Sequence, residues 1–279
     1  MRIYAGYDLE FKCVAPTPAF LLLQVHPSRV SDLETDDKIS FSRPLFAREL
    51  TDAFGNRLTK CLFPAGKTHL HSRFVINDDG LPDRQRLDAC QTGVQDLPVD
   101  TFQFLLGSRY CETQKLSDLA WHLFGNSGEG WRRVQAICDY VNERISFGYQ
   151  YARDDRTAFE AHEERVGVCR DFAHLAISLC RCMNLPARYC TGYLGDIGVP
   201  EDPAPMDFSA WFEVFLEGRW YAFDARHNQP RIGRIVIARG RDAADVAIST
   251  TFGAAQLVTF SVITKQVDPR ANAIKAAAA

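Results

Sequence analysis

The sequence lacks a long hydrophobic run, and it lacks an excess of charge of either sign. Its longest purely apolar stretch is Ala19–Leu23, far short of the roughly 20 residues that a membrane-spanning helix needs. The 32 Lys and Arg residues nearly balance the 35 Asp and Glu residues, which gives a net charge of -3 and no electrostatic reason to bind nucleic acid or an anionic membrane. Met1 is followed by an alternating pattern of apolar residues, and a secretory hydrophobic segment is missing. We therefore expect a cytoplasmic protein that binds neither nucleic acid nor a membrane.

Internal repeats and glycine-rich phosphate-binding motifs are also missing. The nine cysteines are an odd number, scattered along the chain, so we expect reduced thiols and no disulfide framework. His69 and His71 would share one face of a strand, as two metal ligands can. No third ligand is evident beside them in the sequence, so solvent-facing histidines are the simpler interpretation, and we expect neither a metal nor a cofactor.

What is present indicates a globular α+β protein in two parts. With 279 residues, 46% hydrophobic and 24% charged, the chain is long enough for two compact domains. Residues 1–80 alternate between apolar runs and turn signals, which predicts an all-β sandwich-like domain. Residues 81–100 carry Pro82 and Pro98 and read as a linker, and residues 101–270 form the predicted second domain. The strand-like runs of the first part are Ile3 to Phe11, Phe20 to Val25, Leu45 to Leu50, Arg57 to Phe63 and Thr68 to Ile76.

The second part begins with helical patterns. Leu116 to Phe124 and Trp131 to Ile145 repeat their apolar residues at helical spacing. Thr157 and Glu160 match a capping box that opens another short helix. These helices should pack against the helix that starts at Cys169.

A cysteine begins that buried helix. The apolar residues Phe172, Leu175, Ala176 and Leu179 recur on one helical face. Unpaired amides and the helix dipole favour an anion at a helix N-terminus, which biases Cys169 toward the reactive thiolate. An ordinary core cysteine is the alternative.

A hairpin follows the cysteine helix. Met206 to Leu216 and Arg219 to Asp224 read as strands joined at Glu217-Gly218. The predicted register pairs Leu216 with Arg219, and it sets Trp211 opposite Asp224 and Ser209 opposite Arg226. Asp224 and Ser209 would then be diagonal neighbours on one face.

The chain resembles the transglutaminase-like superfamily, and its bacterial two-domain branch in particular. The resemblance rests on Gly167-Val-Cys-Arg-Asp-Phe172, on Ser209-Ala-Trp-Phe-Glu213 and on Gly218-Arg-Trp220 up to Asp224. It implies a papain-like second domain in which Cys169 is the nucleophile and Asp224 orients the catalytic histidine. The family has a His-x-Trp pattern on the first hairpin strand, and here Ser209 occupies the histidine position.

A serine cannot take the thiol proton near neutral pH, so a different base is needed. His227 follows Asp224 but has the opposite strand parity, so it reaches the site only if the strand ends or bulges at Ala225. His174 lies about 140° around the helix from Cys169, which predicts a residue that packs in the core or supports the site from behind. His162 precedes the cysteine helix, and its place is not derivable from the sequence.

Two functions follow from these residues. The first is acyl transfer or hydrolysis at an amide bond of a peptide or protein, through a thioester on Cys169. The alternative is a catalytically degenerate module that binds a peptide or protein. The resemblance also implies a functional link to ATP-grasp, alpha-E and proteasome-like proteins. A local basic cluster could bind an acidic group, although solvated arginines are the simpler interpretation; its members are Arg226, Arg231, Arg234, Arg239 and Arg241.

Overall fold

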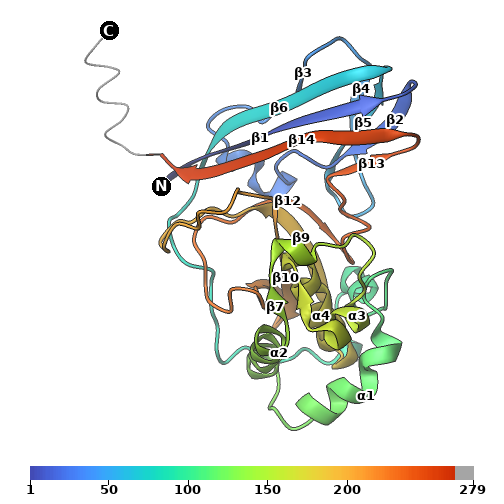
Figure 1. The fold of residues 1–279 in the computed structure, drawn as a ribbon. Coiled ribbons are helices and arrows are strands. Elements are labelled where there is room, and N and C mark those ends of the chain that lie inside the picture. Colours follow the sequence, from blue (N-terminus) through green and yellow to red (C-terminus); the bar gives the residue numbers. More distant parts are fainter. Residues whose placement is uncertain (268–279) are drawn as a thin grey trace.

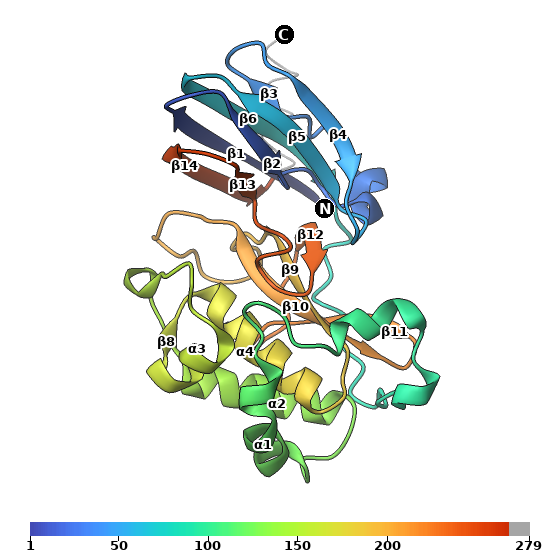
Figure 2. The ribbon, with the colours of Figure 1, turned by 90° about the vertical axis from the view of Figure 1, so that its right-hand side faces the viewer.

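The computed structural model describes residues 1–267 and has an α+β architecture in two parts (Figure 1). A β sandwich forms one end of the molecule and the helices form the other, with a third sheet between them (Figure 2). Residues 268–270, the end of the predicted second domain, lie outside the described residues.

Two antiparallel four-stranded sheets form the sandwich, in the orders β14-β1-β6-β3 and β13-β2-β5-β4. Their inner faces pack together through side chains such as Phe11 and Phe63, whose rings stack 5.1 Å apart. The alternating burial along β1 and β6 confirms the strand pattern read from the sequence. The strands are β1 (Arg2–Cys13), β2 (Thr17–Leu21), β3 (Ser40–Phe41), β4 (Ala47–Thr51), β5 (Arg57–Phe63), β6 (Gly66–Asn77), β13 (Ser249–Thr251) and β14 (Ala255–Gln266).

The two last strands return to the sandwich. β14 pairs with β1 from Ile3 opposite Gln266 to Cys13 opposite Ala255, and β13 pairs with β2. The sequence grouped these strands with residues 101–270, whereas they extend the sheets of the first part. The chain therefore crosses between the two parts twice, and a boundary at residues 81–100 stays a prediction.

The second part surrounds α4 (Cys169–Cys182), which is buried from Asp171 to Cys182. It packs against α1 (Thr113–Phe124), α2 (Trp131–Arg144) and α3 (Ala158–Glu164), and against two strands of an antiparallel sheet of order β11-β10-β9-β12. The remaining strands are β7 (Ser146–Phe147), β8 (Val166–Gly167), β9 (Ala187–Tyr193), β10 (Ser209–Leu216), β11 (Arg219–Phe223) and β12 (Ile235–Gly240). Short 3-10 helices span Pro27–Asp32, Val94–Asp96, Val99–Phe104 and Tyr149–Tyr151.

Local signals in this part are confirmed. Thr157 and Glu160 form the predicted capping box at the start of α3. The β10–β11 hairpin has the predicted register, with Leu216 opposite Arg219. Its ladder ends at Phe212 opposite Phe223, so the expected pairs of Trp211 with Asp224 and of Ser209 with Arg226 do not belong to it.

The hairpin ladder ends because Asp224 turns the chain. Its Oδ1 accepts hydrogen bonds from the backbone N–H groups of Arg226 and His227, each at 3.1 Å. The N–H of Asn228 donates to the carbonyl oxygen of Asp224 at 2.8 Å. An aspartate that caps a turn in this way competes with continuation of the strand. Elsewhere, no helix within residues 1–267 has both the length and the apolarity to cross a membrane.

Candidate active site

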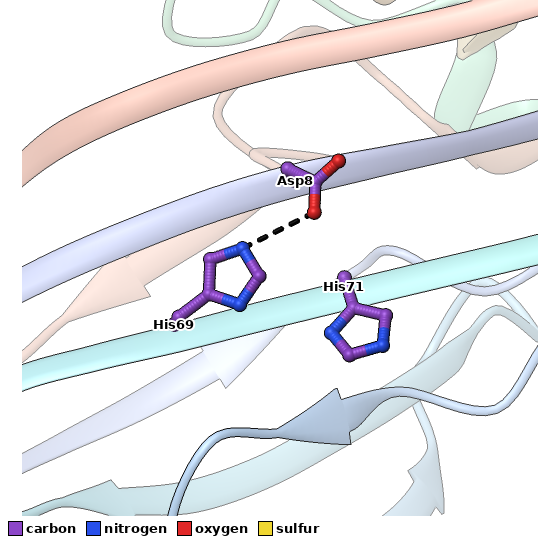
Figure 3. A group of neighbouring side chains, drawn as sticks. All are labelled: Asp8, His69 and His71. Carbon is purple, nitrogen blue, oxygen red and sulfur yellow. Dashed lines mark hydrogen bonds and ion pairs between the residues drawn. The ribbon is translucent and has the colours of Figure 1, made fainter.

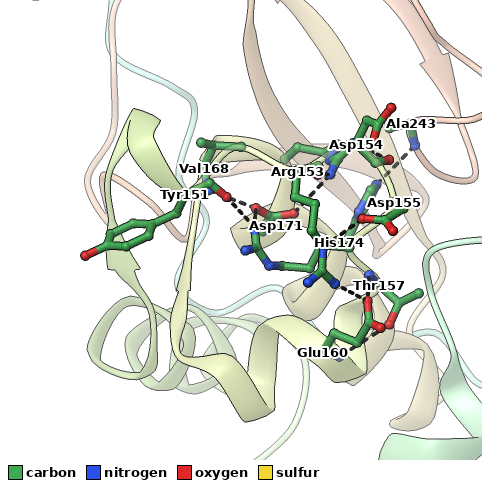
Figure 4. Close-up of polar contacts among 12 residues, drawn as sticks. Tyr151, Arg153, Asp154, Asp155, Thr157, Glu160, Val168, Asp171, His174 and Ala243 are labelled. Carbon is green, nitrogen blue, oxygen red and sulfur yellow. Dashed lines mark hydrogen bonds and ion pairs between the residues drawn. The ribbon is translucent and has the colours of Figure 1, made fainter.

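The start of α4 is held by a buried carboxylate. Asp171 Oδ2 accepts a hydrogen bond from the N–H of Val168 at 2.9 Å (Figure 4). The same oxygen pairs with Arg156 Nη1 at 3.0 Å. A Cβ atom at Gly167 would lie 2.7 Å from this carboxylate, so the close approach requires glycine. Cys169 is thereby fixed in the first turn, where a helix presents unpaired amide groups.

The Cys169 thiol borders two cavities. One has a volume of about 70 Å³ and the other of about 620 Å³. Both are lined by Cys169, Asp207, Phe208 and Ser209. Cys169 is half-buried and lies between these two cavities.

Cys169 is not a preformed thiolate in this environment. Burial raises the pKa of its thiol to about 11, and nearby Asp207 also raises it. The guanidinium of Arg226 and the backbone amide of Ala210 oppose this shift only in part. The thiolate bias expected from the helix position is therefore outweighed by burial, and a thiol with this pKa needs a base to take its proton.

His227 and Asp224 form a hydrogen-bonded pair at a cavity that Cys169 also lines. His227 lines the smaller cavity together with Cys169 and Ser209. Its Nδ1 lies 2.9 Å from Asp224 Oδ2. Burial alone would raise the pKa of Asp224, but Arg234 and His227 hold it well below its ordinary value. An ionised carboxylate only accepts hydrogen bonds, so Nδ1 of His227 is the donor in this contact and Nε2 is the ring nitrogen left for another partner.

The turn that carries His227 is fixed from two sides. Asn142 on α2 donates to the carbonyl oxygens of Ala225 at 2.9 Å and of Arg226 at 2.8 Å. Arg234 Nη2 lies 3.0 Å from Asp224 Oδ2, and the Nε of the same arginine lies 2.9 Å from Asp83. From the sequence, His227 could reach the site only if the strand ended or bulged at Ala225. The strand β11 ends at Phe223, before Ala225.

The other predicted site residues have different surroundings. Ser209 is the first residue of β10, is 8% exposed and lines both cavities. His174 is fully buried, which lowers its pKa well below the ordinary value, and its Nε2 accepts from the N–H of Ala243 at 3.1 Å (Figure 4). Its predicted packing role is confirmed. His162 contacts the hydroxyl of Tyr140 at 3.3 Å.

The basic cluster is mostly neither solvated nor free to bind an acidic ligand. Arg234 pairs with Asp83 and Asp224, and Arg239 pairs with Glu213. Arg231 is buried, and Arg241 pairs with Asp245. Sequence reasoning missed these pairs because carboxylates such as Asp83 lie far from the arginines along the chain. Arg226 is the exception, since its guanidinium lies 3.6 Å from the centre of the Phe147 ring and close enough to affect the Cys169 thiol.

The region that contains Cys169, Ser209 and Asp224 is similar to a known protein family. Residues 118–225 match the model of the transglutaminase-like superfamily, a range that includes Cys169, Ser209 and Asp224. A crystal structure of a candidate cysteine protease from Cytophaga hutchinsonii superimposes with a TM-score of 0.82 at 31% identity. The alignment covers 96% of this chain and 91% of that protein, so the β sandwich and the helical part are both included.

Shorter matches are found in mycobacteria. An uncharacterized protein of Mycobacterium tuberculosis is 40% identical over 91 residues, which is 29% of this chain and 29% of that protein. A similar protein of Mycobacterium leprae is 33% identical over 88 residues, or 29% of this chain and 30% of its own length. The matched region therefore spans less than a third of each mycobacterial relative.

Proposed function

Because this chain belongs to the transglutaminase-like superfamily, we propose that it is a cysteine-dependent enzyme that acts on an amide bond of a peptide or protein. Cys169 is the nucleophile, His227 the general base and Asp224 the residue that orients His227. Ser209 lines the site but moves no proton. The observation that carries this proposal is the 2.9 Å contact between His227 Nδ1 and Asp224 Oδ2, with His227 and Cys169 lining one cavity.

The first half of the reaction forms a thioester. Nε2 of His227 takes the proton of the Cys169 thiol as the sulfur attacks the carbonyl carbon of the amide. The negative charge that develops on the carbonyl oxygen is stabilised by N–H groups at the start of α4. The C–N bond then breaks, and the leaving amine takes the proton from the imidazolium of His227.

The second half releases the acyl group. Water or a second amine gives a proton to Nε2 of His227 and attacks the thioester carbonyl. The C–S bond breaks, the sulfur recovers a proton from His227, and a carboxylic acid or a new amide leaves. Arg226, beside the thiol, would favour the transient thiolate through its positive charge.

A second candidate is a binding module that lost its catalysis. The observation in its favour is Ser209 in the usual histidine position, together with a thiol whose pKa is raised to about 11. On this account the two cavities beside Cys169 hold a peptide without reaction, and His227 only caps the turn.

Activity assays on site variants separate the two functions. Peptide amides and protein substrates are incubated with and without an added amine, and released amine, carboxylic acid and new amide are measured by mass spectrometry. We expect Cys169→Ala to abolish turnover. We expect His227→Asn to lower kcat about 10² to 10⁴-fold, the usual contribution of a general base.

Ser209 supplies the matched comparison. Ser209→Ala should stay within about threefold of the natural chain, because no proton passes through the hydroxyl. If only Ser209→His gains activity and the natural chain has none, the base is lost and the binding module is correct. If His227→Asn keeps the full rate, the assignment of the base is wrong.

A further inference from the structure

The outer face of the sandwich carries two histidines and a carboxylate close together (Figure 3). His69 and His71 are two residues apart on β6 and so share a face of the sheet. Asp8 on β1 is directly opposite His71 in the register. One ligand atom from each of the three residues lies within 4.8 Å of the others. The cluster is in the sandwich, whereas Cys169 begins α4 at the helical end of the molecule.

Two imidazoles and a carboxylate are a common ligand set for zinc and neighbouring divalent transition metals. His69 Nε2 lies 3.1 Å from Asp8 Oδ1. Two ligand atoms on a tetrahedral zinc ion with bonds near 2.0 Å are about 3.3 Å apart. These two atoms therefore already have the separation that a shared ion would need.

The surroundings of the cluster support ligation. The guanidinium of Arg73 pairs with Asp8 Oδ2, which orients the carboxylate and leaves Oδ1 toward the histidines, as outer-shell partners of ligands do. Nδ1 of His71 is shielded from solvent and has no hydrogen-bond partner. A buried ring nitrogen without a partner is costly, and an ion coordinated by Nδ1 itself would supply the missing partner.

We propose that Asp8, His69 and His71 form a binding site for a divalent transition metal ion of the zinc type. The protein supplies three ligands, and the remaining coordination positions are open to water or to an outside group. The three ligand atoms lie within 4.8 Å of one another, and small side-chain movements would bring them to the spacing of about 3.3 Å around a tetrahedral ion. The ion links β1 to β6 and stabilises the sandwich, because it binds the folded chain and not the unfolded one.

Zinc titration tests the site directly. ZnCl₂ is titrated into the full chain by calorimetry, and the unfolding temperature is measured with zinc and again after EDTA. We expect one zinc ion to bind the natural chain and raise its unfolding temperature reversibly. His69→Ala and His71→Ala should each weaken that binding at least tenfold and remove the shift. His122→Ala, which removes an exposed histidine on α1, should change neither.

Thiols also bind zinc, so cobalt substitution identifies the ligands. A cobalt complex of Asp8, His69 and His71 has no sulfur-to-metal charge-transfer band. The proposal is wrong if zinc does not bind at micromolar concentration, if the His69 and His71 variants bind as the natural chain does, or if cobalt binding gives only a thiolate spectrum.

Discussion

Cys169 combines a helix N-terminus, which favours a thiolate, with burial, which favours the neutral thiol. Burial has the larger effect here, since it raises the pKa of the thiol to about 11. At neutral pH only about one molecule in 10⁴ then carries the thiolate. On the proposed mechanism, the sulfur is therefore activated by a base during attack and is not a thiolate beforehand.

Alkylation of Cys169 should therefore increase steadily with pH. Labelling by iodoacetamide tracks the thiolate, so we expect the rate at Cys169 to rise through pH 9 without a plateau. At pH 7 the rate should be at least tenfold below that of an ordinary thiol with a pKa near 8.5. The rate at each cysteine is measured by peptide mass spectrometry across pH 6 to 10.

The exposed thiol of Cys90 is the reference in the same samples, and Cys169→Ala identifies the peptide signal. A plateau below pH 8 at Cys169 would mean that a thiolate is present in the resting protein, contrary to this account.

The sequence alone indicated Cys169, Asp224 and the departure at Ser209, because these positions carry local motifs. It could not decide on His227, since strand parity pointed its side chain away from the site. What the sequence did not show is that Asp224 accepts hydrogen bonds from the backbone N–H groups of Arg226 and His227, where the strand ends. The pair of Arg234 with Asp83 was missed because it joins segments that lie far apart in the sequence.

At the scale of elements, the carboxylate of Glu213 forms ion pairs with arginines on two other strands of its sheet. Glu213 on β10 is paired with Arg188 on β9 at 2.7 Å and with Arg239 on β12 at 3.0 Å. Burial alone would raise the pKa of Glu213, but the charges of Arg239 and Arg188 outweigh it and lower the pKa to about 2. The turn at Glu217-Gly218 predicted the hairpin register, whereas the pairing of β9 with β12 depends on contacts far along the chain.

Glu213→Gln should destabilise the protein by about 3 kcal/mol or more at pH 7, because two arginines lose a buried partner. The folded-state pKa is lowered, so the charge stabilises the fold above the unfolded value of 4.5, and this contribution is lost as the pH falls toward 2. The difference in free energy of unfolding between variant and natural chain should shrink over that range. Urea unfolding at pH 7, 4 and 3 measures it.

Glu34→Gln is the matched control. Glu34 is 39% exposed and pairs with Arg2 on the sandwich, so its loss should cost less than about 1 kcal/mol at any pH. A difference at Glu213 that stays constant from pH 7 to pH 3 would contradict the assigned pKa.

At the scale of the whole molecule, the path of the chain connects the two parts, because the last two strands, β13 and β14, return to the sandwich. The sequence predicted both parts, since strand alternation and helical spacing are local. It did not predict that β13 and β14 return to the sandwich, because register with β2 and β1 is a property of the folded sheet. With two crossings of the chain, unfolding of one part should affect the other.

Asn56, in the turn between β4 and β5, joins the parts directly. It is fully buried, its Nδ2 donates to the carbonyl oxygen of Arg239 and its Oδ1 accepts from the N–H of Arg239, both at 2.8 Å. Asn56→Ala leaves both backbone groups of Arg239 without these partners, which should cost about 2 to 4 kcal/mol. Asn77→Ala is the control, because Asn77 is exposed and its side-chain amide donates only to Asp32, at 3.4 Å.

All four tryptophans lie in the second part, at residues 121, 131, 211 and 220, whereas Asn56 belongs to the sandwich. Tryptophan fluorescence in urea therefore reports on the part that does not contain the substitution. We expect Asn56→Ala to lower the fluorescence midpoint and the circular-dichroism midpoint together, since a cooperative unit unfolds in one transition. A fluorescence midpoint that stays in place while the circular-dichroism transition splits would mean that the sandwich unfolds independently, and that the returning strands do not couple the two parts.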